Sequence, residues 1–466
     1  SIGMTNTGNA EEGGRLGFVG RLKYDYANRY YIEGSFRYDG SDNFAPGHRW
    51  GFFPSVAAAW DITEEPFFKN LNLKNINLLK LRASYGTTGT ETNVNRFGYL
   101  STYNMVENAV CIGGNLISGF NEGALVSPDL LSWYTRRSLN IGIDGSFLDN
   151  KLKGSADYFF YVTKGGLTSP ADRYITPLGT KLPQIKSDNE HRREGFELSL
   201  RWSDKIGSDI DYEIGANMIS YRNLWVTNRG EGLSQLKNPY QRNTHQSDYL
   251  GLYLLDNGLY QSIEQVLGVP RRPESTETKL GDIVYQDING DGKINSEDKV
   301  RYGMPIDPHF TYGVDFLFAY KGFTLSGLFY GTGKRHMMFG VNARKAESQY
   351  VKNKFQLDYW REDNRNATFP RISMVAGVNG ENNRIESTFY LRNAAFLRLK
   401  NLSLTYDFKH KLLKSAKWLS TCQVSLTGSN LFTISGVSDY WDPETTNTNG
   451  GYPTSRIYSL GVTLGF

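Results

Sequence analysis

The amino-acid sequence predicts an all-β fold, namely a transmembrane antiparallel β-barrel. Segments of about ten residues alternate between apolar and polar side chains, which is typical of strands that face lipid on one side and water on the other. Short and long connections alternate between these segments. No apolar run approaches the ~18–20 residues that a membrane-spanning helix needs. The sequence therefore excludes a helical membrane protein and favours a barrel of strands.

The last ten residues show the alternation most clearly. Tyr458, Leu460, Val462, Leu464 and Phe466 fall on one face of an extended chain, and small or polar residues fill most of the positions between them. An edge strand this apolar would invite aggregation in water unless it were paired. Closing a barrel in a membrane removes such an edge, so we expect these residues to form a barrel strand.

The same alternation recurs along the chain and predicts thirteen strands. In order, the predicted strands are 15–26, 30–39, 51–61, 78–86, 133–147, 152–163, 193–203, 210–222, 310–320, 323–332, 395–408, 421–433 and 454–466. Leu148-Asp-Asn-Lys151 and Lys321-Gly322 are hairpin turn signals between neighbouring strands. Residues 64–70 are compatible with a short helix, and a change of phase around Lys400 predicts a β-bulge.

The connections predict two different ends of the barrel. The short ones are 27–29, 62–77, 148–151, 204–209, 321–322 and 409–420, and the long ones are 40–50, 87–132, 164–192, 223–308, 333–394 and 434–453. Outer-membrane barrels have short periplasmic turns and long extracellular loops. Charges of both signs on the polar faces suit a wide hydrated lumen, whereas in a dry soluble core they would be prohibitive.

An odd number of strands cannot close a bacterial single-chain barrel, in which strands are even in number. We therefore expect residues 1–466 to be the carboxy-terminal portion of a larger barrel whose other strands lie on an amino-terminal piece. A soluble β-protein, such as tandem sandwiches or a propeller, is the alternative, but no repeat of ~40–50 residues supports a propeller.

Composition agrees with this assignment. Aromatic residues make up 14% of the 466 residues, which suits interfacial girdles, although glycan-binding β-proteins would show the same enrichment. The formal net charge of +4 gives no case for a nucleic-acid partner. Cys111 falls in a long loop and Cys422 in a predicted strand, so a disulfide between them is not expected.

One motif predicts a metal site. Residues 287–298 match an EF-hand-like or dockerin-like calcium loop, with oxygen ligands expected from Asp287, Asn289, Asp291, the Lys293 carbonyl and Asp298, and with Gly292 at the sharp turn. We expect a structural Ca²⁺ that braces the 223–308 loop. The alternative is an Asx-rich turn that caps itself without metal.

The search for catalytic residues is negative. The six histidines are scattered, at positions 48, 191, 245, 309, 336 and 410, and no HExxH motif or Cys/His cluster is present. The sequence therefore predicts neither an enzyme nor an organic cofactor. The aromatic pairs Trp133-Tyr134, Tyr359-Trp360 and Tyr440-Trp441 could stack on sugar rings or peptide side chains, but membrane anchoring or loop packing is favoured. Substrate-binding residues stay unassigned.

Several runs resemble the SusC/RagA family of TonB-dependent outer-membrane transporters of Bacteroidetes. They lie in the family's order and are found at 139–144, 195–198, 281–295, 302–305, 310–313, 358–371, 391–402, 429–432, 441–443 and 452–456. The resemblance implies a barrel of about 22 strands with an amino-terminal plug. This chain would then supply about thirteen carboxy-terminal strands, and the plug would be absent from it.

The resemblance also implies function and partners. It predicts TonB-dependent import of oligosaccharides or oligopeptides across the bacterial outer membrane, with a SusD-like surface lipoprotein as a lid. The amino-terminal plug, the remaining strands, the TonB-ExbB-ExbD complex and outer-membrane lipid would be further partners. A siderophore or cobalamin receptor, or a porin, is the alternative within the same class, and a secreted carbohydrate-active β-protein is the alternative from a different class.

Overall fold

A computed structural model describes residues 12–91, 94, 99–100, 103–122, 131–168, 185–186, 188–242, 248–344, 354–373, 378–445, 452 and 454–466. In this part of the chain thirteen strands form one antiparallel sheet, in the order β1-β2-β3-β4-β7-β8-β11-β12-β17-β18-β21-β22-β23. Their bounds are β1 Arg15–Tyr26, β2 Tyr30–Ser41, β3 Trp50–Asp61, β4 Ile76–Thr90, β7 Tyr134–Phe147, β8 Leu152–Lys164, β11 Glu190–Ile206, β12 Ile210–Thr227, β17 Phe310–Tyr320, β18 Phe323–Thr332, β21 Phe396–Asp407, β22 Thr421–Ser435 and β23 Ile457–Gly465. Each predicted strand corresponds to one of these, so the predicted fold is confirmed.

Some strands are longer than the sequence pattern predicted. β4 continues to Thr90, which pairs with Tyr134 at the start of β7. β12 likewise continues to Thr227, which pairs with Glu190 of β11. These strand ends lie at the end of the sheet that carries the long loops. There the regular alternation of apolar and polar side chains is lost. Backbone pairing with the neighbouring strand extends them.

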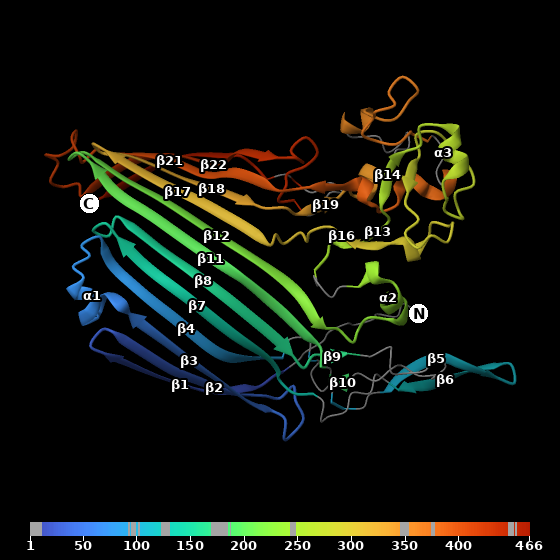
Figure 1. Ribbon diagram of the computed structural model, residues 1–466, viewed down its shortest axis with the longest axis horizontal. Helices are drawn as coiled ribbons and strands as arrows, with labels where there is room; N and C mark the ends of the chain where they lie inside the picture. Colours follow the sequence, from blue (N-terminus) through green and yellow to red (C-terminus); the bar gives the residue numbers. More distant parts are fainter. Residues whose placement is uncertain are drawn as a thin grey trace, which may run out of the picture.

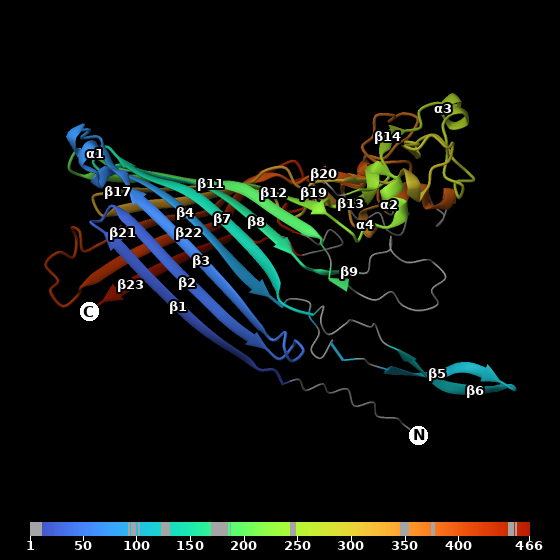
Figure 2. The same ribbon diagram turned by 60° about the horizontal axis from the view of Figure 1, so that its bottom comes forward.

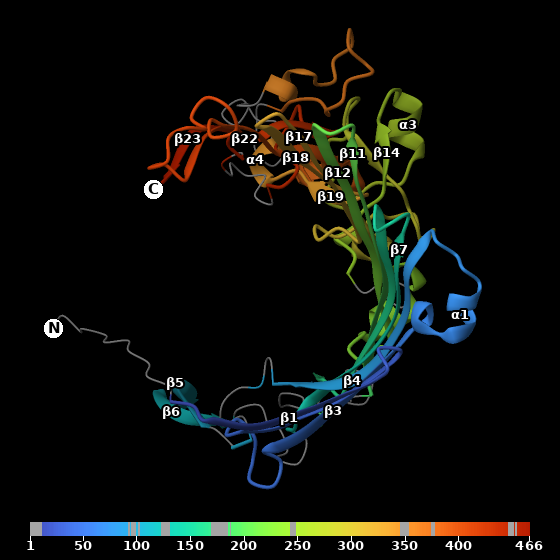
Figure 3. The ribbon, with the colours of Figure 1, turned by 90° about the vertical axis from the view of Figure 1, so that its left-hand side faces the viewer.

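The sheet is curved into an open arc. Figure 3 shows this arc with β1 and β23 at its two ends. Arg15 on β1 forms an ion pair with Glu91, just past the end of β4. Three strand spacings of ~4.8 Å separate β1 from β4, so the ion pair crosses the inside of the curve. The face that carries Arg15 is therefore the concave face.

The two faces differ as predicted. On the concave face, Arg21 pairs with Glu33 at 2.6 Å, and Arg82 pairs with Asp144 at 2.7 Å and with Asp157 at 3.0 Å. The convex face presents large exposed apolar side chains on every part of the arc, among them Leu16, Phe18, Leu22, Ile32, Phe52, Ile141, Tyr158, Phe196, Ile214, Leu404, Leu426, Leu460 and Val462. A lipid-facing exterior and a charged, hydrated interior account for this division.

Gly142 makes room for one of these ion pairs. A Cβ at this position would clash with the Asp157 carboxylate and would lie 2.8 Å from Nη2 of Arg82. The absence of a side chain at Gly142 therefore lets Arg82 of β4 reach past β7 to Asp157 of β8.

Short turns gather at one end of the sheet, which we call the turn end, and long connections gather at the other, the loop end (Figures 1 and 2). Ala27 and Asn28 both have φ 55°, as a two-residue turn between twisted strands requires. The connection from β3 to β4 contains η1 (Ile62–Glu64) and α1 (Pro66–Asn70), which confirms the expected helix. The bulge at Lys400 is also confirmed, because the register of β21 against β22 shifts between Leu399 and Asn401.

The long connections carry secondary structure of their own. β5 (Tyr103–Ile112) and β6 (Asn115–Glu122) form a separate hairpin between β4 and β7, and β9 (Leu167–Thr168) pairs with β10 (Ile185–Lys186). Cys111 on β5 and Cys422 on β22 are both free. No helix in the described ranges is both long and apolar enough to span a membrane.

The described parts of the connections 228–309, 333–395 and 436–445 fold together at the loop end, and we call them the loop body (Figure 1). Its elements are α2 Leu233–Lys237, η3 Pro239–Gln241, β13 Gly251–Tyr253, β14 Asp256–Leu259, α3 Ile263–Gly268, β15 Ile283–Tyr285, η4 Ser296–Asp298, β16 Val300–Tyr302, β19 His336–Met338, α4 Val341–Arg344, η5 Lys354–Leu357, η6 Val378–Arg384, η7 Thr388–Tyr390 and β20 Leu391–Asn393. One apolar core contains buried residues from the first two connections, and Tyr440 and Trp441 from the third pack against it.

Candidate functional site

The predicted calcium loop lies on the loop body, between β15 and β16. The Asp287 carboxylate accepts hydrogen bonds from the backbone N–H groups of Gly290 at 2.7 Å and Gly292 at 2.8 Å. Gly292 has φ +80°, which confirms the sharp turn expected there. Asn289 accepts from the N–H of Asp291 at 3.0 Å, and Asp291 accepts from the N–H of Lys293 at 2.8 Å. The loop is thus closed by its own side chains.

Asp298 is fully buried at the end of this loop. Its carboxylate accepts hydrogen bonds from the N–H groups of Ile288 at 2.9 Å and Asn295 at 2.8 Å. The neighbouring Ile294 is 1% exposed and belongs to the apolar core of the loop body. Together these contacts anchor the loop at its carboxy-terminal end.

The donor chemistry of the loop suits a hard cation. A carboxylate has about four acceptor sites, and the hydrogen bonds of Asp287 and Asp291 leave some of theirs unused. Within the described ranges, however, no group of three or more His, Cys, Asp or Glu side chains is placed to hold a metal ion. One of the six histidines, His245, lies outside the described residues. Binding of Ca²⁺ by this loop therefore stays a prediction.

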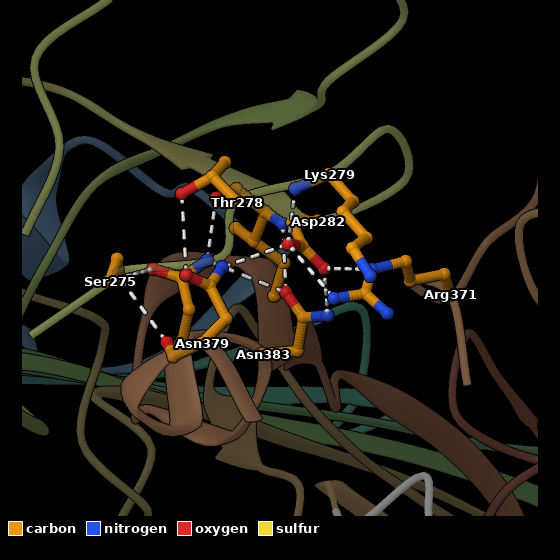
Figure 4. A network of polar contacts seen from close by, with 9 residues as sticks. Ser275, Thr278, Lys279, Asp282, Arg371, Asn379 and Asn383 are labelled. Carbon is orange, nitrogen blue, oxygen red and sulfur yellow. Dashed lines mark hydrogen bonds and ion pairs between the residues drawn. The ribbon is translucent and has the colours of Figure 1, made fainter. Parts of the chain in front are cut away.

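A buried aspartate links the first two connections of the loop body (Figure 4). Asp282 is fully buried, and its carboxylate accepts hydrogen bonds from Arg371 Nε at 2.6 Å, Asn379 Nδ2 at 2.8 Å and Asn383 Nδ2 at 2.7 Å. The backbone N–H of Lys279 donates a fourth, at 2.9 Å. This satisfied network is the condition under which a buried charge is tolerated. No pattern in the sequence predicted this network, although both Asp282 and Arg371 lie in runs that resemble the family.

A buried arginine attaches the third connection to the sheet. Arg398 on β21 is fully buried and pairs with Asp442 and Glu444. Lys400, the residue at the bulge, also reaches Glu444, at 3.3 Å. Two cations of one strand therefore contact the same acidic segment. An arginine inside an otherwise alternating strand was the available signal.

Another polar network lies at the loop end of β11, β12 and β17. Arg193 Nε donates to Asn223 Oδ1 at 2.6 Å, and Asn223 Nδ2 donates to the Asp248 carboxylate at 2.6 Å. His309 Nε2 lies 2.8 Å from the same carboxylate. Burial opposes ionisation of Asp248, but the hydrogen bonds from His309 and Asn223 outweigh it and hold the pKa of this carboxyl below its usual range.

The three aromatic pairs pack within the protein, as favoured from the sequence. Trp360 is 7% exposed in the core of the loop body, and Trp441 meets Phe339 edge-on with ring centroids 4.5 Å apart. Trp133 packs against Phe53, and its Nε1–H donates to the carbonyl of Arg49 at 2.9 Å.

Comparisons with known proteins support this architecture. The family described as "TonB dependent receptor-like, beta-barrel" matches residues 3–431. TonB-dependent receptor P3 of Formosa agariphila is 28% identical over 486 residues, which cover 96% of this chain and 45% of that protein. TonB-dependent receptor SusC of Bacteroides thetaiotaomicron is 26% identical over 475 residues, covering 97% of this chain and 44% of that protein.

The chain thus spans somewhat less than half the length of these relatives. Among solved structures, the RagAB peptide importer in its closed-closed state is similar, with a TM-score of 0.73 and 23% identity, covering 98% of this chain and 48% of that chain. At this identity the likeness shows the fold. The thirteen-stranded arc with its charged concave face and the match over residues 3–431 agree, and the chain belongs to the TonB-dependent receptor-like β-barrel family.

Proposed function

We propose that this chain forms part of the barrel wall and outer surface of a SusC-like transporter, which imports oligosaccharides or oligopeptides across the bacterial outer membrane. The observation that carries the proposal is the coupling of the loop body to the sheet. Arg398 joins the acidic segment 442–444 to β21, and Asp282 joins two connections to each other. A folded loop body fixed to the loop end of a sheet with a charged, hydrated concave face suits a chamber that receives a solute.

The orientation and partners follow from the same proposal. The loop end faces the outside of the cell, the turn end faces the periplasm, and the exposed convex face lies in outer-membrane lipid. A SusD-like lipoprotein docks on the loop side as a lid. An amino-terminal plug and further strands complete the barrel, and the TonB-ExbB-ExbD complex drives import through them. The chain itself has no catalytic role.

We also propose that the 287–298 loop binds Ca²⁺ as a structural ion. The bound ion would supply positive charge between the oxygens of Asp287, Asn289 and Asp291. Support comes from the spacing of these side chains and from their unused acceptor capacity.

The experiment that tests the import proposal measures uptake in cells. Cells with and without the complete gene that encodes this chain are fed defined oligosaccharide and oligopeptide mixtures, and solute depletion is followed by mass spectrometry. Loss of depletion on deletion, and equal loss on removal of TonB, is the expected result. Uptake that persists without TonB would support a porin, and recovery of the protein in the soluble fraction would contradict the proposal altogether.

A further inference from the structure

Several arginines on the concave face are neutralised within the chain. Arg21, Arg82 and Arg201 each form an ion pair with a carboxylate on a neighbouring strand. These arginines lie along the strands, away from the loop end. These ion pairs join neighbouring strands, and the paired carboxylates offset the arginine charges.

Three other arginines are arranged differently. Arg136 near the start of β7, Arg193 near the start of β11 and Arg335 between β18 and β19 all lie at the loop end. Across the described ranges, no carboxylate lies within ion-pair distance of any of the three. Arg136 lies over the ring of Tyr161 at 4.0 Å, and Arg193 lies over that of Tyr221 at 4.8 Å.

The register of the sheet places Arg136 and Arg193 on the concave face. Arg82 pairs in register with Gly142 of β7, and side chains alternate from there back to Arg136. On β11, Arg201 and Arg193 have the same parity and therefore share a face. Both guanidinium groups thus point to the side of the sheet that a solute would cross.

Arg335 gives the strongest evidence that an anion binds at the loop end. It is 5% exposed, and its Nε has no hydrogen-bond partner in the described structure. The hydroxyl of Thr332, which is 4% exposed, also lacks a partner. Burial lowers the pKa of Arg335, and Tyr330, Glu444 and Asp307 act against that effect, which shows that all three lie near. Neither carboxylate forms an ion pair with Arg335 in the described structure, and a buried guanidinium nitrogen without a partner is costly, so an anion is expected to contact it.

Two of the nearby carboxylates already have partners, whereas Asp307, which lies near Arg335, is exposed to solvent. Glu444 accepts from Arg398 at 2.6 Å and from Lys400 at 3.3 Å. The Asp248 carboxylate contacts His309 and Asn223 through Oδ2, and its buried Oδ1 has no partner within the described structure. Arg136 and Arg193 are therefore left for a group that approaches from the space inside the arc, and Arg335 is left for an anion at the loop end.

We propose that Arg136, Arg193 and Arg335 form a carboxylate-binding belt around the mouth of the chamber, and that the imported solute is a chain bearing several carboxylates. An acidic oligopeptide and an oligosaccharide of uronic acids share this chemistry. Guanidinium groups pair with carboxylates through two parallel hydrogen bonds, and the neighbouring tyrosine rings offer flat surfaces to the rest of the chain. The inference rests on the proposed import function and narrows its substrate class.

The test uses the complete transporter that contains this chain, purified in detergent. Isothermal titration compares two pairs of probes: a Glu/Ser octapeptide with its Gln/Ser counterpart, and hexagalacturonate with its methyl ester. In low salt the carboxylate member of one pair is expected to bind about tenfold more tightly than its neutral counterpart, with the preference falling as salt is added. The pair that shows the preference identifies the source of the carboxylates.

Variants test whether the three arginines of the belt cause the preference for carboxylate probes. The triple variant Arg136→Gln, Arg193→Gln, Arg335→Gln is expected to bind both members of the pair equally. Arg137→Gln is the matched control, because it removes a neighbouring exposed arginine from the opposite face of β7 and should keep the preference. If the triple variant does not fold, the double variant at the two exposed positions, 136 and 193, is expected to lose most of the preference.

Equal binding of charged and neutral probes by the unmodified protein would overturn the proposal, as would a preference that survives in the variants. A variant at Arg335 that loses thermal stability without changing the preference would instead show that an acidic group elsewhere in the protein occupies this position. These outcomes are distinct from failure of the import function, because TonB-dependent uptake of neutral solutes would continue in each of them.

Discussion

Arg398 on β21 donates through Nη2 to both carboxylate oxygens of Asp442, each at 2.8 Å. The arginine is fully buried, and the two residues lie on either side of β22 in the chain. The pair therefore fixes the start of the last long connection against the loop end of the sheet. Because the guanidinium of Arg398 is shielded from water, removing one partner of the pair is expected to lower the stability of this segment strongly.

Arg398→Met is expected to lower the stability of this part of the loop body by roughly 3–5 kcal/mol, since it leaves Asp442 without its partner and Glu444 with Lys400 alone. Hydrogen exchange of the amides around residues 436–445 would measure the change. Lys205→Met serves as the control, because its partner Asp211 is exposed and the pair is solvated. Equal protection of the 436–445 amides in both variants would show that the buried pair does not fix this segment.

Gly142→Ala is expected to destabilise the barrel by roughly 1–3 kcal/mol, because the added methyl group overlaps the ion pair between Arg82 and Asp157. The temperature at which the folded band disappears in heat-modified electrophoresis would report this. Gly34→Ala is the matched control, since a Cβ there meets no atom within 4 Å. A Gly142 variant as stable as the Gly34 variant would show that the ion pair moves aside at no cost.

The calcium loop can be tested with two variants that separate metal binding from self-capping. If Ca²⁺ binds, it should slow protease cleavage of the 287–298 loop, and Asp287→Asn should abolish that protection because it removes a charged ligand. Asp298→Asn should speed cleavage even in EGTA, since the Asp298 carboxylate accepts backbone hydrogen bonds without any metal. Cleavage rates that do not respond to Ca²⁺ in the unmodified protein would favour the self-capped turn.

The lowered pKa of Asp248 predicts that the stability of the structure at the loop end of β12 and β17 depends on pH. Because its pKa is lower in the folded protein, the carboxylate favours folding at pH values above the ordinary aspartate pKa of ~3.9. That contribution is lost as the pH falls through the folded value. The amide of Tyr221, which donates to the carbonyl of His309 at 2.9 Å, is a local reporter of this contribution.

Hydrogen exchange at the Tyr221 amide should be slower in the unmodified protein than in Asp248→Asn at neutral pH, after correction for the intrinsic exchange rate. The two should converge in acid, where the unmodified carboxyl is protonated. A difference between the two proteins that is the same at both pH values would mean that the charge of Asp248 does not stabilise this network.

The strands could be predicted from the sequence because their cause is local. Lipid on one face and water on the other impose a two-residue period, so positions such as Leu460 and Val462 reveal the fold without knowledge of any partner strand. Turn residues such as Ala27 and Asn28 act within two positions of each other. The bulge at Lys400 could also be predicted locally, because the alternation of apolar and polar residues changes phase there.

The loop body could not be predicted in this way, because its strands have only three or four residues and show no period. Its stability depends on contacts between distant residues, such as Asp282 with Arg371, 89 positions apart. Whether Arg335 lacks a carboxylate partner is also invisible until the chain is folded. The sequence by itself determined the strands, their faces and their turns, since each follows from local alternation. Only the tertiary structure decided which loop side chains meet, because burial and pairing of charges depend on distance in space.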